Sequence, residues 1–144
     1  MKGYVWVLLL AMASMNCFAG FDEGSAAYEA KDYQAALSEF LPLANDGDAK
    51  SQVKIGLMYD NGEGVAQNYG KAVLWYRKAA AQNNADAQYY LGLMYFKGNG
   101  VSKEHSQAAS WFRKAAEQGN VEAQFKLGLM YIKADGVSKD YSQA

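Results

Sequence analysis

The sequence predicts an all-α protein, an α-solenoid (α/α superhelix) of helix-turn-helix units with a period of 36 residues. The motif Gly-Leu-Met-Tyr recurs at residues 56–59, 92–95 and 128–131, which sets this period. Residues 49–84 match residues 85–120 at 17 of 36 positions, far above chance. A repeat of this length indicates stacked supersecondary units that bury one continuous core.

Two amphipathic helices are expected in each unit, because apolar side chains recur at helical spacing. The first helix has a face at i, i+4, i+7 and i+8, formed by Ser51, Ile55, Met58 and Tyr59 and, one unit later, by Ala87, Leu91, Met94 and Tyr95. The second helix has a face at i, i+3, i+4 and i+7, formed by Ala72, Trp75, Tyr76 and Ala79 and then by Ala108, Trp111, Phe112 and Ala115. The recurring tryptophans are therefore expected to be buried between hairpins.

Turn and cap residues mark the ends of these helices. Within a unit, Gly-x-Gly-Val at residues 62–65 and 98–101 permits a turn between the two helices. Between units, a residue type that tolerates the left-handed conformation precedes an N-cap residue, in the pairs Gly47-Asp48, Asn83-Asn84 and Gly119-Asn120. Pro42 lies inside the earliest second helix and is expected to kink it.

Residues 1–19 are predicted to be a signal peptide. Lys2 precedes an apolar run from Tyr4 to Ala13, and small residues at Cys17 and Ala19 suit cleavage before Gly20. The run is about half the length that a membrane-spanning helix needs. We therefore expect export, either to the periplasm or as a secreted protein, with a lipoprotein anchored at Cys17 as the alternative.

The remaining residues, 20–144, are predicted to form one repeat domain. It comprises a degenerate half-repeat at 24–47, repeats at 48–83 and 84–119, and a truncated repeat at 120–144. The last unit ends where its second helix begins, so its apolar residues Leu127, Met130, Tyr131 and Val137 are expected to lack cover. Two explanations stay open: the chain self-associates through this incomplete repeat, or it is a structural fragment of a longer repeat protein.

Composition excludes several function classes. Fourteen basic and 15 acidic residues give a net charge of −1, which does not suit a nucleic-acid partner. One cysteine and one histidine are too few for a zinc site or an intramolecular disulfide. His105 occupies the register position of Tyr33, Tyr69 and Tyr141, so it is interpreted as an aromatic substitute rather than a general base. No catalytic, metal or cofactor residue is predicted.

The conserved spacing within each unit resembles that of the Sel-one-like repeat family, which is related to tetratricopeptide repeats. The family pattern is Ala-x-x-x-Leu-Gly-x-x-Tyr, then Gly-x-Gly-Val, then Ala-x-x-Trp-x-x-Lys-Ala-Ala. In this chain it is matched by Ala87, Leu91, Gly92, Tyr95, Gly98, Gly100, Val101, Ala108, Trp111, Lys114, Ala115 and Ala116. The tetratricopeptide repeat itself is disfavoured by its shorter period of about 34 residues.

The resemblance implies an α-solenoid that binds other proteins and has no active site. Some exported members of the family are rich in cysteine, with disulfide-linked helix pairs and affinity for β-lactam or cell-wall compounds. This chain lacks those cysteines. A cell-wall-directed or β-lactam-binding hydrolase-like function is therefore kept only as an alternative to a protein-interaction module.

Function is expected where the units differ. A second stripe on the first helices, at i, i+4 and i+7 with flanking positions, varies in chemistry while Leu57, Leu93 and Leu129 within it recur as packing residues. These variable positions could hold an extended peptide or a partner helix, or they could pack between hairpins. The candidate partner-binding surface comprises Val53, Lys54, Asp60, Tyr89, Tyr90, Phe96, Phe125, Lys126 and Ile132.

Overall fold

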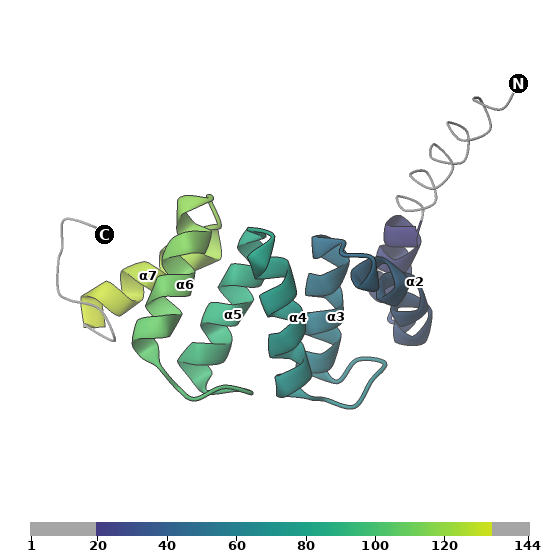
Figure 1. The fold of residues 1–144 in the computed structure, drawn as a ribbon, viewed down its shortest axis with the longest axis horizontal. Helices are drawn as coiled ribbons and strands as arrows, with labels where there is room; N and C mark the ends of the chain where they lie inside the picture. Colours follow the sequence, from purple (N-terminus) through teal and green to yellow (C-terminus); the bar gives the residue numbers. More distant parts are fainter. Residues whose placement is uncertain (1–19, 134–144) are drawn as a thin grey trace, which may run out of the picture.

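The computed structural model describes residues 20–133, and every regular element in this range is an α-helix. A helix over residues 20–29 is followed by α2 (Tyr33–Asn45), α3 (Ala49–Asn61), α4 (Tyr69–Ala81), α5 (Ala85–Lys97), α6 (His105–Glu117) and α7 (Val121–Lys133). The helices stand side by side in one row, with helix 20–29 and α2 at one end and α7 at the other (Figure 1). Each helix packs on its neighbours in the chain, so the predicted all-α solenoid is confirmed.

The helix ends lie where the cap residues predict them. The side chains of Asp48, Asn84 and Asn120 each accept a hydrogen bond from the backbone N–H three residues later, at 2.7–2.9 Å. α3 and α5 end at Gly62 and Gly98, whose φ values of +73° and +76° are left-handed. The local sequence therefore defines a hairpin of two 13-residue helices joined by a glycine-rich turn.

The core is centred on one large aromatic side chain from each second helix. Phe40, Tyr76 and Phe112 are spaced 36 residues apart and are fully buried. The rings of Tyr76 and Phe112 lie against Gly56 and Gly92 of the preceding first helices, where an added β-carbon would be 2.5 Å and 2.7 Å away. Glycine at these two positions thus permits the close approach of the two helices within a hairpin.

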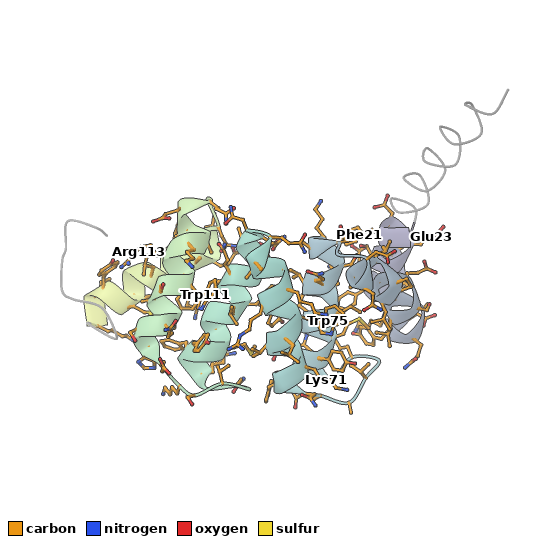
Figure 2. The ribbon with its side chains drawn as sticks, viewed as in Figure 1. Phe21, Glu23, Lys71, Trp75, Trp111 and Arg113 are labelled. Atoms are coloured by element: carbon orange, nitrogen blue, oxygen red, sulfur yellow. The ribbon has the colours of Figure 1, made fainter. Side chains whose placement is uncertain are left out.

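The prediction that the recurring tryptophans are buried between hairpins is wrong in degree. Trp75 and Trp111, labelled in Figure 2, are half-buried and lie at the edge of the core. The ammonium groups of Lys78 and Lys114 lie 4.1 Å and 4.4 Å from their ring centroids. The physical reason is helical geometry, because the core-facing position is the one after each tryptophan.

Successive units are joined by contacts that recur with the same period. Arg77 donates to the hydroxyl of Tyr95 at 3.0 Å, and Arg113 donates to that of Tyr131 at 2.8 Å. A ladder of glutamine side chains also recurs with this period, but it lies within each unit: Gln82 donates to Gln52 at 2.9 Å, and Gln118 donates to Gln88 at 2.8 Å. Gln52 and Gln88 are buried, so the ladder satisfies polar groups that would otherwise be costly in the core.

The first unit contains a helix that the sequence analysis did not assign. Helix 20–29 connects to α2 through residues 30–32 only, a turn shorter than the connections in later units. Gly24 faces the ring of Phe40, as Gly56 faces Tyr76. The predicted half-repeat at 24–47 is therefore part of a hairpin with a shortened turn, and α2 runs through the exposed Pro42.

The predicted signal peptide, including Cys17, and residues 134–144, including Val137, lie outside the described residues. None of the helices within residues 20–133 has both the length and the apolar character needed to cross a membrane. In α7, Met130 and Tyr131 are only 3% and 4% exposed and Leu127 is half-buried. The expectation that Leu127, Met130 and Tyr131 lack cover is therefore wrong, because these side chains lie on the face of α7 that packs against α6.

Candidate functional site

The nine predicted site residues lie on α3, α5 and α7, at three repeated positions of the first helices. One of them does not belong to a surface. Val53 is only 7% exposed and packs in the same core cluster as Val73 and Tyr76. Its place in the candidate site is corrected, because Val53 packs among core residues of α4 and α5 rather than facing solvent.

Tyr89 and Tyr90 form the aromatic centre of the remaining surface. The ring of Tyr90 stacks on that of Tyr76, with centroids 5.2 Å apart and an interplanar angle of 16°. Tyr89 lies 5.3 Å from Tyr90 and 5.9 Å from Phe112. Both tyrosines are half-buried, so each ring packs on the core with one part and leaves another part accessible. Burial raises the pKa of both hydroxyls, which therefore stay protonated at neutral pH.

Asp60 lies at the edge of this aromatic group. The hydroxyl of Tyr76 donates to its carboxylate at 3.4 Å. Burial raises the pKa of Asp60, while the charge of Lys97 and the Tyr76 hydrogen bond act in the opposite direction. Burial, followed by the charge of Asp60, raises the pKa of Tyr76 well above its ordinary value. The half-buried carboxylate thus supplies a fixed acceptor beside the tyrosine rings.

Lys54 and Phe96 are positioned by contacts outside the stripe. The ammonium group of Lys54 lies 5.1 Å from the ring centroid of Tyr28 in helix 20–29. Tyr28 in turn donates to the carboxylate of Glu63 in the connection between α3 and α4. Phe96 stacks on His105 with centroids 4.8 Å apart and an interplanar angle of 15°. His105 is the first residue of α6, so it occupies the helix-start position that the sequence predicted.

Two of the three candidate residues on α7 are more exposed than their counterparts on α3 and α5. Phe125 is 65% exposed and Ile132 is 60% exposed, while Lys126 is half-buried. Val121, which the sequence analysis missed, is 69% exposed and lies one turn before Phe125. The i, i+4, i+11 spacing of these apolar residues could have indicated it, but its counterparts Ala49 and Ala85 are small side chains that mark no apolar position.

The described residues of this surface supply groups that can bind a ligand. Within residues 20–133, no three side chains of His, Cys, Asp or Glu gather where they could hold a metal ion. The surface of α3 and α5 offers aromatic faces, hydroxyl groups, a lysine and a carboxylate, which together can stack on and hydrogen-bond to a ligand. A separate groove of about 580 Å³ lies on α2 and includes Leu37, Leu41 and Pro42 in its lining.

The fold defines an α-solenoid of helical hairpins with a 36-residue period. Three stretches of the chain, residues 49–84, 85–120 and 121–144, match the model of the Sel1 repeat. The chain therefore belongs to the Sel1 repeat family, which confirms the resemblance drawn from its motifs. Members of this family typically mediate protein–protein interaction and are generally non-catalytic scaffolds.

Solved structures agree with this assignment. The chain is 41% identical to a Sel1 repeat protein from Oxalobacter formigenes, with a TM-score of 0.78, over 82% of this chain and 49% of that one. It is 38% identical to a protective antigen of uropathogenic Escherichia coli strains that displays an SLR fold, with a TM-score of 0.84, over 94% of this chain and 30% of that one.

A third similar structure is the cysteine-rich protein B of Helicobacter pylori, which is 29% identical with a TM-score of 0.59, over 62% of this chain and 68% of that one. No curated protein sequence matches the chain. The chain spans about half the length of the Oxalobacter formigenes protein and less than a third of the Escherichia coli antigen.

Proposed function

We propose that this chain is an exported protein-interaction module that holds an extended peptide or a partner helix against α3 and α5 and catalyses no reaction. The observation that carries this proposal is the half-exposed pair Tyr89 and Tyr90. Their counterparts in the preceding unit are Val53 and Lys54, whereas the core positions nearby keep the same type of side chain in both units. In a repeat protein, such variation on a shared framework is where binding specificity is expected to lie.

The proposed peptide-binding surface consists of Lys54, Asp60, Tyr89, Tyr90 and Phe96. Tyrosine rings provide large contact areas with little side-chain entropy to lose, and their protonated hydroxyls can donate to peptide carbonyls. Asp60 can accept from peptide N–H groups, and Lys54 can donate to carbonyl or carboxylate oxygens. Apolar, donor and acceptor groups on the first helices of two successive units suit an extended backbone with alternating side chains.

A peptide library displayed on phage and selected against the immobilised protein tests this surface. Peptides that bind the wild type should lose at least about tenfold in affinity for Tyr90→Ala and for Lys54→Glu. Leu74→Ala is the matched control, because Leu74 is 59% exposed on α4 and lies outside the surface. Equal binding by all three variants, each shown to be folded by circular dichroism, would contradict the proposal.

Export belongs to the same proposal and rests on residues 1–19. We infer cleavage before Gly20 and release to the periplasm or the medium, with lipidation of Cys17 as the alternative. The intact mass of the protein recovered from expressing cells separates these outcomes. A mass beginning at Gly20 supports cleavage, a lipid-modified N-terminus at Cys17 supports the anchor, and a retained apolar run contradicts both.

The rival function is a cell-wall-directed or β-lactam-binding protein. The similarity in fold to the cysteine-rich protein B of Helicobacter pylori is the reason to test it, although this chain has a single cysteine. Hydrolysis of nitrocefin or of purified muropeptides by the wild-type protein would overturn the proposal of a non-catalytic module. We also propose that the chain self-associates through its last repeat.

A further inference from the structure

An apolar stripe without a described partner runs along one face of α7. Val121, Phe125 and Ile132 are 69%, 65% and 60% exposed, and they lie on one face at i, i+4 and i+11. They account for three of the four large hydrophobic side chains found exposed in residues 20–133. Gly128 lies on the same face, and a β-carbon added there would meet no atom within 4 Å. No described residue therefore covers Val121, Phe125 and Ile132.

In the preceding units, the second helix of the hairpin covers the equivalent face at its central glycine. A β-carbon at Gly56 would be 2.5 Å from the ring of Tyr76, and one at Gly92 would be 2.7 Å from that of Phe112. Val53, the counterpart of Phe125, is buried. Comparison with α3 and α5 therefore indicates that this face of α7 can receive a helix with apolar side chains.

Charge is divided along the row of helices. Residues 20–48 carry Lys31 against seven acidic side chains, a net charge of −6: Asp22, Glu23, Glu29, Asp32, Glu39, Asp46 and Asp48. Residues 69–133 carry nine basic and four acidic side chains, a net charge of +5. Because helix 20–29 and α2 lie at one end of the row and α7 at the other, the molecule has an acidic end and a basic remainder (Figure 1).

We propose that the α7 face of one molecule docks into the groove on α2 of a second copy, so that the protein associates head to tail. The groove provides apolar cover from Leu37, Leu41 and Pro42, and Asp46 lies at its edge. Phe125 and Ile132 enter it, while Lys126 and Lys133 of α7 face Glu39 of α2 and Asp46, which directly follows the helix. The occupant is a second copy because its acidic hairpin complements the charge of the basic end.

This interface is heterologous, because it joins two different surfaces of the same chain. Each molecule keeps one free α7 face and one free α2 groove after docking, so association continues into chains unless the geometry closes a ring. The mean mass should therefore rise steadily with protein concentration. It should fall as the salt concentration is raised from about 0.05 to about 0.5 M, since salt screens the attraction between the oppositely charged ends.

Two blocking variants test the direction of the interface. Phe125→Glu places a charge in the α7 stripe, and Ser38→Arg places a large cation in the α2 groove, whose lining includes Ser38. Each variant alone should be monomeric, with association at least about tenfold weaker than in the wild type. Mixed together they should form one-to-one heterodimers, because each retains the surface that the other lacks.

The measurement is sedimentation velocity on the protein purified from cells, with its N-terminus established by intact mass and its fold by circular dichroism. Leu74→Glu is the matched control, since Leu74 is equally exposed but lies on neither surface, and it should associate like the wild type. A monomeric wild type at every concentration and salt overturns the proposal. Dimers of Ser38→Arg alone overturn it too, because they require a symmetric α7 contact.

This association does not use the peptide-binding surface of α3 and α5, so the two proposals fail independently. Tyr90→Ala should keep the association of the wild type, and Phe125→Glu should keep its peptide affinity. Loss of association in Tyr90→Ala would show that the copies meet along α5 instead.

Discussion

Gly92 lies directly against the ring of Phe112, so that a β-carbon at Gly92 would be 2.7 Å from two ring atoms. The same relationship joins Gly56 to Tyr76 in the preceding unit. In contrast, the equivalent Gly128 faces open space within the described residues. One sequence position thus has two environments, which separates the effect of packing from that of helix propensity.

Substituting these glycines with alanine should have opposite effects. Gly92→Ala forces Phe112 to move and should lower the free energy of unfolding by about 1 to 3 kcal/mol, reduced by the helix propensity of alanine. Gly128→Ala meets no neighbour and should raise it by up to about 1 kcal/mol. Urea denaturation of both variants measures the difference. Stabilisation by both substitutions would show that the close approach at Gly92 is not real.

The core position and the tryptophan position should differ in importance. Phe112 is fully buried, and Phe112→Ala should cost about 3 to 5 kcal/mol, enough to unfold a domain of marginal stability. Trp111 is half-buried beside Lys114, so Trp111→Ala should cost clearly less. Thermal circular dichroism gives the order of the two melting temperatures. A lower melting temperature for Trp111→Ala than for Phe112→Ala would reverse our assignment of the core.

The turn glycines connect one unit to the previous one. A β-carbon at Gly100 would be 2.6 Å from the backbone carbonyl group of Tyr69 at the start of α4, and Gly64 approaches Tyr33 in the same way. Gly100 also has a φ of +68°, which a side chain disfavours. Gly119 has a φ of +89° but no neighbour within 4 Å.

Comparison of Gly100→Ala with Gly119→Ala isolates the inter-unit contact. Both substitutions introduce backbone strain of about 1 kcal/mol, but only the first also displaces Tyr69. We expect Gly100→Ala to lower the free energy of unfolding by at least about 1 kcal/mol more than Gly119→Ala. Chemical denaturation of both variants gives this difference directly, and equal losses would mean that the loop yields without disturbing α4.

These contacts show what the repeat pattern could predict. The helices and their caps followed from the 36-residue period, because each is encoded within one unit. The predicted face of the second helix contains each tryptophan and the residue after it, but the structure buries Tyr76 and Phe112 fully and leaves Trp75 and Trp111 half-buried. The tryptophan recurs because it has the same environment in both units, at the edge of the core under a lysine side chain.

The candidate site was less predictable for a related reason. The stripe was defined by variation between units, but variation alone does not distinguish a solvent-facing position from one that packs on a neighbour of different shape. Val53 is small and buried, its counterpart Tyr89 is half-buried, and Phe125 is exposed. Only the placement of the next helix separates these environments, and that placement is a property of the stack rather than of one unit.

The buried phenol of Tyr76 gives the stability a dependence on alkaline pH. Its ordinary pKa is 10.0, and in the folded protein burial, with the charge of Asp60, raises this pKa. Above about pH 10 the unfolded chain therefore releases a proton that the folded chain retains, so the unfolded state binds fewer protons and stability falls as pH rises. Below about pH 10 both states hold the proton and the contribution of Tyr76 is fully present.

Tyr76→Phe removes this titrating group and keeps the ring against Gly56. The wild type should lose up to about 1.4 kcal/mol of unfolding free energy per pH unit above about pH 10 from this residue. The variant should show a slope shallower by that amount, while Tyr28, Tyr89 and Tyr90, whose pKa values are also raised, maintain the remaining dependence. Urea denaturation between about pH 8 and about pH 11 measures both slopes. Tyr76 is fully buried in the folded protein. Identical slopes for the wild type and the variant would therefore mean that the Tyr76 hydroxyl ionises in the folded state and that its contact with Asp60 is absent.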